Sequence, residues 1–152
     1  MAVNPNVDFT SGAVLTAAQQ NRFPRGVVAF GSATASTVVG ATETTQITAS
    51  AFTAVANRYY RITYYEPTPN PAAGASSYID LKIKNGATTL QKATTQNSGA
   101  TSVVNALMVQ FTTTFTAGSV TLTGTAQATA ASNIYRSATQ VGQLLVEDIG
   151  PA

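Results

Sequence analysis

The sequence contains no cysteine, no histidine and no tryptophan, and only 9% of its 152 residues are charged. Without histidine and cysteine, the Ser-His-Asp and Cys-His catalytic arrangements, the usual zinc sites and disulfide bonds are excluded. The six carboxylates do not cluster in sequence, although two of them could still converge in the fold. We therefore predict that the protein is not an enzyme, and we expect no catalytic residue, no cofactor and no metal site.

Long apolar runs are also missing, since no stretch approaches the 18 or more residues that a transmembrane helix needs. The N-terminus lacks the charged and apolar regions of a signal peptide. The eight basic residues are scattered between Arg22 and Arg136, which makes a continuous phosphate-binding stripe hard to build. These absences predict a soluble, folded protein with no nucleic-acid partner, no membrane insertion and no export by the ordinary route.

Threonine and alanine are abundant, with eleven glycines, and this composition favours strands and turns over long helices. A chain of this length has room for one domain with a modest core. We predict an all-β fold, an antiparallel β-sandwich of jelly-roll or Ig-like type over residues 25–152. An N-terminal arm and a short anchoring helix occupy residues 1–24. The strands expected, about eight, are Val27–Phe30, Thr45–Ala49, Arg58–Glu66, Tyr78–Lys84, Thr88–Thr94, Leu107–Thr116, Ser119–Ala128 and Gln143–Asp148.

The short helix is predicted after Thr16, whose hydroxyl can cap residues 17–22. Phe23 precedes Pro24 and therefore avoids the α region, which ends the helix after about two turns. Such a short helix is marginal without a surface to pack against.

Two hairpins are expected. Residues 78–84 alternate apolar and polar, and Asn85-Gly86 suits a type I′ turn, which would place Leu90 opposite Leu81. A second hairpin is expected around Ala117-Gly118.

The loop at residues 67–76 contains three prolines and is predicted to form no ladder. The predicted core comprises Ile79, Leu81, Ile83, Leu90, Leu107, Val109, Phe111, Val120 and Leu122.

The tract at residues 58–65 interleaves tyrosines and arginines, as a surface that stacks sugars would. On this interpretation Tyr59, Arg61 and Tyr65 form a ligand-contact surface. The alternative is a central strand that is covered on both faces and whose two arginines are paired.

Neighbouring acidic residues at 147–148 face opposite ways and cannot share a metal without a bulge. Asp80 and Lys82 are expected on a solvent-facing side, in a weak cross-strand ion pair with Lys92 or another neighbour.

Three segments resemble small virion proteins of tailed bacteriophages. Residues 9–29 (FTSGAVLTAAQQNRFPRGVVA) resemble the opening of such proteins, where a G-x-V-L-T-A-A-Q-x-N segment precedes an R-G-V-V-A strand. Residues 57–63 (NRYYRIT) and 143–152 (QLLVEDIGPA) continue the similarity, so that it covers about a third of the chain. The resemblance implies a non-enzymatic β-domain that assembles on the tail or the capsid and is located in the virion.

Three functions remain open on this basis. The first is a minor tail or fibre protein, the second is a capsid decoration protein, and the third is a carbohydrate-binding module that attaches to a host surface glycan. We expect sibling subunits, most simply a trimer by analogy with phage fibres, and other virion proteins as partners. The sandwich has no evident room for the apolar side chains of the N-terminal segment. The predicted assembly interface is therefore Val7, Phe9, Val14, Leu15 and Phe23.

Overall fold

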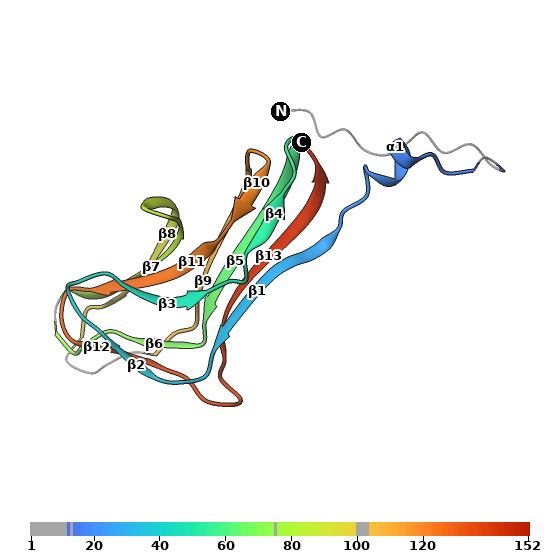
Figure 1. Cartoon of the computed structure of the whole chain (residues 1–152). Helices are drawn as coiled ribbons and strands as arrows, with labels where there is room; N and C mark the ends of the chain where they lie inside the picture. The colour runs from blue at the N-terminus through green and yellow to red at the C-terminus, as the bar shows by residue number, and fades with distance from the viewer. Residues whose placement is uncertain (1–11, 13, 75, 100–103) are drawn as a thin grey trace.

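The computed structural model describes residues 12, 14–74, 76–99 and 104–152, and this part of the chain consists almost entirely of β-strands (Figure 1). It has thirteen strands and one helix, and every strand pair is antiparallel. The elements are α1 (Ala17–Gln20), β1 (Gly26–Ala33), β2 (Thr37–Val39), β3 (Thr44–Thr48), β4 (Phe52–Ala54), β5 (Arg58–Glu66), β6 (Thr68–Asn70), β7 (Ser77–Asn85), β8 (Thr88–Asn97), β9 (Leu107–Thr114), β10 (Gly118–Val120), β11 (Leu122–Ala128), β12 (Ser132–Tyr135) and β13 (Gly142–Pro151).

These strands confirm the predicted all-β fold, although the expected number of about eight was too low. The additional strands are three- and four-residue elements such as β2, β4 and β12, which are too short to show a periodic pattern in the sequence. The helix begins after Thr16, as predicted, and is only four residues long. The choice between a jelly-roll and an Ig-like topology stays a prediction.

Two four-stranded sheets form the body of the protein. We name them the β5 sheet, with strand order β1-β13-β5-β9, and the β7 sheet, with order β3-β11-β7-β8. Two smaller sheets, β10-β4 and β2-β12-β6, lie beside them. A Cβ atom added to Gly124 of β11 would lie 2.9 Å from the ring of Tyr64 in β5. The ring therefore packs directly on the backbone of the other sheet, as expected for a sandwich.

Most of the predicted core is buried. Ile79, Leu81 and Ile83 of β7 are fully buried, and Val109, Val120 and Leu122 are buried as well. The other three predicted residues, Leu90, Leu107 and Phe111, are only partly buried and pack against the edge of the core. The reason is that β8 and β9 are the outer strands of their sheets.

The first hairpin joins β7 to β8, as predicted, but its turn is displaced by one residue. Asn85 pairs with Thr88, so the two turn residues are Gly86 and Ala87. Gly86, the first turn residue, has a φ of +56°, whereas Ala87, the second, has no positive φ, which fits a type II′ turn rather than the predicted type I′ turn. The ladder also shifts its register between Ile83 and Lys84.

The displaced turn and this register shift together make the predicted partner of Leu81 wrong. Leu81 lies opposite Ala93, and Leu90 is the extra residue of the bulge. A bulge inserts one residue into one strand, so the later side chains of that strand exchange faces. Alternation in the sequence alone does not reveal such an insertion.

The second predicted hairpin is wrong. β9 pairs with β5, whereas β10 pairs with β4, and β11 lies between β3 and β7. The chain thus crosses from one sheet to the other near Phe115, whose ring lies 6.1 Å from that of Phe52 and 5.5 Å from that of Tyr60. Burying this aromatic cluster favours the crossing over a local turn.

The prediction of a loop without a ladder at residues 67–76 is also wrong in part. Residues 68–70 form β6, in which Pro69 lies opposite Ile134 of β12. β6 is an outer strand of the β2-β12-β6 sheet. An outer strand tolerates proline because only one of its sides pairs with a neighbour.

Candidate functional site

The N-terminal segment is attached to the sandwich by the buried side chain of Arg58. Its Nη1 and Nη2 atoms donate hydrogen bonds to the carbonyl oxygens of Asn21, at 2.5 Å, and Phe23, at 2.6 Å. Its Nε and Nη2 atoms also donate to the carboxylate of Asp148, at 2.5 and 2.7 Å. One arginine therefore connects the segment after α1 to the last strand of the sandwich.

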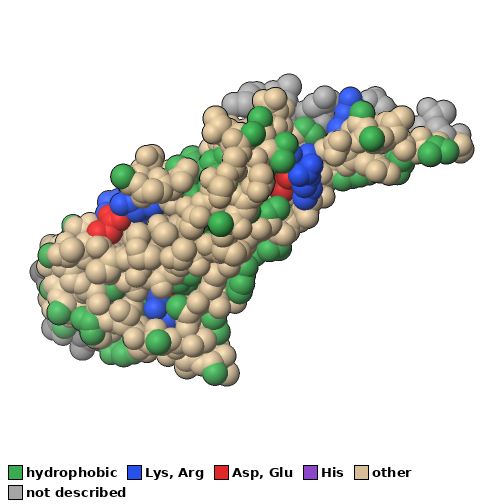
Figure 2. All heavy atoms as spheres, in the orientation of Figure 1, with side chains coloured by type: hydrophobic (Ala, Val, Ile, Leu, Met, Phe, Trp, Pro, Cys, Tyr) green, Lys and Arg blue, Asp and Glu red, His purple; other side chains and the backbone are tan. Residues whose placement is uncertain are grey.

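The hollow at this junction is basic. It has a volume of about 320 Å³ and is lined by Arg22, Arg25 and Arg58 together with residues 55–57 and Pro151. The Nε atom of Arg25 lies 4.0 Å from the Asp148 carboxylate. Figure 2 shows that charged side chains are sparse on the visible face and gather in small groups, one of them where the N-terminal segment meets the sandwich.

The helix itself contributes nothing to the core. α1 is held by a capping box, in which the Thr16 hydroxyl accepts from the Gln19 amide and the Gln19 side chain accepts from the Thr16 amide. None of its residues is buried, and the segment stands off the body in Figure 1. Val14 is 90% exposed, Leu15 41% and Phe23 40%.

Of the predicted assembly interface, Val14, Leu15 and Phe23 are thus presented to solvent by the described part of the segment. Val7 and Phe9 lie outside the described residues. The interface itself stays a prediction.

The predicted ligand-contact residues lie on the outer face of the β5 sheet. Tyr59, Arg61 and Tyr65 are half-buried, and alternate with fully buried neighbours that point into the core. β5 lies between β13 and β9 and both of its arginines are paired, as the alternative interpretation predicted, but its outer face is only half-buried rather than fully covered. The Nε atom of Arg61 donates to the Glu147 carboxylate at 2.9 Å, and this hydrogen bond raises the pKa of Arg61. Contact with a ligand stays a prediction.

The same face exposes apolar side chains from neighbouring strands. Phe30 of β1 is 45% exposed and lies opposite Leu145 of β13, while Met108 of β9 is 56% exposed and lies opposite Tyr65. The outer face of the β5 sheet therefore carries apolar surface beside the Arg61–Glu147 ion pair.

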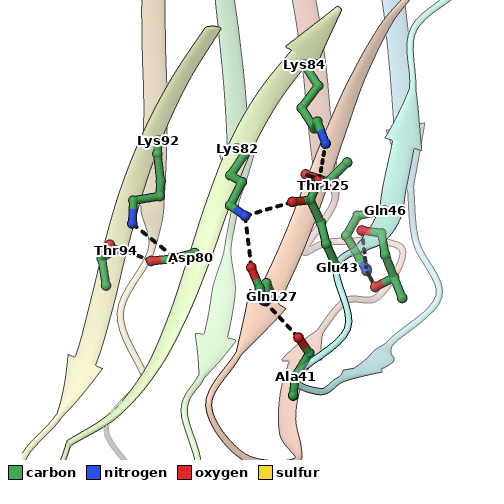
Figure 3. Close-up of polar contacts among 11 residues, drawn as sticks. Ala41, Glu43, Gln46, Asp80, Lys82, Lys84, Lys92, Thr94, Thr125 and Gln127 are labelled. Carbon is green, nitrogen blue, oxygen red and sulfur yellow. Dashed lines mark hydrogen bonds and ion pairs between the residues drawn. The ribbon is translucent and has the colours of Figure 1, made fainter. Parts of the chain in front are cut away.

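The outer face of the β7 sheet carries a polar network around Glu43 (Figure 3). Glu43 precedes β3, and its carboxylate accepts from Lys82 and Lys84, both at 2.7 Å, and from Thr125 at 2.9 Å. Hydrogen bonds from the two lysines lower the pKa of Glu43 from 4.5 to about 2. Glu43 was not predicted as a partner, because it is 39 residues from Lys82.

Asp80 forms the predicted ion pair with Lys92, at 3.1 Å, and also accepts from Thr94 at 2.6 Å. Its predicted solvent exposure is wrong, because Asp80 is only 6% exposed. One oxygen of its carboxylate accepts from Lys92 and the other from Thr94, both on the neighbouring strand β8 (Figure 3).

The Glu43 network predicts a loss of stability in acid. Since the folded-state pKa is lowered, ionised Glu43 stabilises the fold fully above its ordinary pKa of 4.5, and this contribution is lost as the pH falls toward 2. The contribution of ionised Glu43 to the free energy of unfolding is at most about 3 kcal/mol. The true value is smaller, because solvent reaches the carboxylate and screens its ion pairs. Urea unfolding of Glu43→Gln should show lower stability than the unchanged protein at pH 7, with the difference shrinking at pH 2.5. A difference independent of pH would contradict this assignment.

A second ionic cluster is fully buried at the far end of β5. Glu66 accepts from the Nε and Nη2 atoms of Arg136, at 2.8 and 2.6 Å, and from the hydroxyl of Tyr64 at 2.7 Å. Burial and the negative charge of Glu66 raise the pKa of Tyr64. Burial alone would lower the pKa of Arg136, but Glu66 raises it overall. Arg136 is thus held as a cation inside the protein.

The two neighbouring acidic side chains near the end of β13 are both engaged in ion pairs. Glu147 and Asp148 face opposite sides of β13, as predicted, and each is paired with an arginine of β5. Among the described residues, no three side chains of the kinds that bind metals lie together. No helix in the described ranges is long and apolar enough to cross a membrane.

No family model and no curated protein matches this sequence.

Proposed function

We propose that the protein is a non-enzymatic structural component of a tailed phage virion, a minor tail or fibre protein that assembles through its N-terminal segment. The observation that supports this most directly is the exposure of Val14, Leu15 and Phe23 on a segment that is tied to the sandwich but buries none of its own helix. A four-residue helix gains its stability from packing, so this segment needs a partner surface. Sibling subunits, most simply in a trimer, and other virion proteins supply that surface.

The attachment through Arg58 suits such a role. Its ion pair with Asp148 is buried, and its bonds to Asn21 and Phe23 hold the segment at a fixed place on the sandwich. A partner that binds the segment therefore also positions the sandwich. The few charges on the protein reduce the side-chain entropy that is lost when neighbouring subunits pack.

The same segment would serve a capsid decoration protein equally well, and this is the alternative. Immunogold labelling of intact virions distinguishes the two, because label on the tail supports the first proposal and label on the head supports the alternative.

Deleting residues 1–20 tests assembly while keeping the two carbonyl groups that Arg58 binds. The shortened protein should remain folded and monomeric and should no longer join the particle, whereas the full chain should form an oligomer in multi-angle light scattering. Leu15→Ser should weaken assembly, and Val38→Ser, which alters an exposed apolar residue on β2, should not. A full-length monomer at high concentration, together with a shortened form that still joins virions, would overturn the proposal.

A further inference from the structure

A second hollow lies at the opposite end of the β5 sheet from α1. It has a volume of about 360 Å³ and is lined by Tyr65, Pro67, Thr139, Gln140, Val141 and Gln143. β1 and β13 pair from Gly26 with Asp148, near the N-terminal segment, to Ala33 with Gly142, near this hollow. At the usual rise of about 3.3 Å per residue, the seven steps from Gly26 to Ala33 separate the two ends by roughly 23 Å. Figure 1 shows the turn between β12 and β13 at the end of the molecule away from α1.

The lining of this hollow combines one aromatic ring with uncharged polar groups. Tyr65 is half-buried and offers an aromatic surface, and Pro67 and Val141 add apolar surface beside it. The side chains of Gln140, Gln143 and Thr139 supply amide and hydroxyl groups that both donate and accept hydrogen bonds. A pyranose ring has the matching chemistry, since its C–H face packs on an aromatic ring and its hydroxyls bond to amides.

None of the six lining residues is charged, and this favours neutral sugars over acidic ones. An acidic sugar would need a cation to replace the water that it loses on binding. The nearest arginine on this strand face, Arg61, is engaged by Glu147 and does not line the hollow. The hollow therefore suits a neutral saccharide.

One wall of the hollow is the loop between β12 and β13, residues 136–141. Hydrogen bonds within this loop hold it in one conformation. The Ser137 hydroxyl accepts from the amides of Thr139, at 3.3 Å, and Gln140, at 3.1 Å. The backbones of Ser137 and Gln140 also bond to each other in both directions, at 3.0 and 3.2 Å. Such a loop loses little entropy when a ligand binds.

Both ends of this loop are fixed by the buried ionic cluster of β5. Arg136, at one end, is bound to Glu66. At the other end a Cβ atom on Gly142 would lie 2.6 Å from the Glu66 carboxylate and 2.9 Å from the Arg136 Nε atom, so the backbone is packed directly on the pair. Tyr65 lies between Tyr64 and Glu66, two members of the same cluster. The wall and the aromatic residue thus share one rigid base.

We infer that the hollow beside Tyr65 is a binding site for a neutral saccharide, with Tyr65 as the stacking residue and Gln140, Gln143 and Thr139 as the hydrogen-bonding groups. This goes beyond the proposed assembly role and does not depend on it, because the site lies far from the N-terminal segment. A subunit anchored by that segment would present the site at its free end.

Titration of the full chain with maltotriose, cellotriose and chitotriose, followed by amide NMR, and a glycan array carrying neutral and acidic glycans test the inference. At least one neutral saccharide should bind and shift the resonances of residues 65 and 139–143. Tyr65→Ala should weaken that binding about tenfold, which corresponds to about 1.4 kcal/mol for the loss of one stacked ring. Tyr65→Phe should retain most of it.

Tyr59→Ala is the matched control, because Tyr59 lies on the same strand and face but outside the hollow. Thermal unfolding of each variant establishes that the fold is retained, and Gln143→Ala, at an exposed position, provides a second variant at the site. The inference is overturned if no neutral glycan binds, if Tyr65→Ala and Tyr59→Ala bind alike, or if only acidic glycans bind. Retention of binding after deletion of residues 1–20 would show that the site is independent of assembly.

Discussion

Replacing Leu81 by aspartate should unfold the protein. Leu81 lies in β7 with none of its surface exposed, between Ala126 of β11 and Ala93 of β8. Both cross-strand neighbours are uncharged, so the new carboxylate would be buried without a partner, at a cost of several kcal/mol. The total stability of a domain of this size is about 5–15 kcal/mol. Circular dichroism and urea unfolding would measure the loss.

Gln91→Asp provides the control for this substitution. Gln91 lies opposite Ile83 on the neighbouring strand and is exposed, so the same carboxylate should change stability by less than about 0.5 kcal/mol there. Lys82→Asp is less suitable, because it would place a carboxylate beside Glu43. Equal and mild effects at positions 81 and 91 would show that the register of β7 is wrong.

Removing the carboxylate of Glu66 should cause the second largest loss of stability, after Leu81→Asp. Glu66→Ala leaves Arg136 as a buried cation that keeps only carbonyl and amide acceptors from Ala35 and Gln46. It also takes the acceptor from the buried hydroxyl of Tyr64. Breaking a buried ion pair in this way costs about 3–5 kcal/mol, which urea unfolding at pH 7 should detect.

The double variant Glu66→Leu, Arg136→Met removes the whole ion pair, whereas Glu66→Ala leaves one charged partner buried alone. Comparing the two variants separates these two effects on stability. An apolar pair of similar volume often supports the fold as well as an ion pair does, so the double variant should be more stable than Glu66→Ala alone. A Glu66→Ala protein within about 0.5 kcal/mol of the unchanged one would contradict the buried position of the pair.

The parts of the fold that could be predicted from sequence are those that depend on local alternation. β5 and β7 each show a clear period of two, and their buried and exposed faces agree with it for most residues. The partners of a strand cannot be deduced from its own pattern. β9 and β10 were predicted as a hairpin because a turn dipeptide separates them, yet the aromatic cluster around Phe115 directs them to different sheets.

The features of the candidate sites also divide into those that depend on nearby sequence and those that depend on residues far apart along the chain. The exposed apolar residues of the N-terminal segment and the outward position of Tyr65 could be predicted, since both depend on nearby sequence. The ionic clusters could not, because their members are distant along the chain: Arg58 and Asp148 are 90 residues apart, and Glu66 and Arg136 are 70 apart. Gly142, which carries no side chain, gave no indication that it packs on one of them.

The pairing of β1 with β13 has a mechanical consequence for a subunit held at one end and loaded at the other. A pulling force that enters at Gly26 and leaves near Gly142 runs along the two strands, from their first pair to their last. The hydrogen bonds of this ladder then resist in shear and share the load, whereas a force across the strands would open them one after another. The bonds from Arg58 to Asn21 and Phe23 bear part of the tension before it reaches β1, and transfer it through Asp148 to β13.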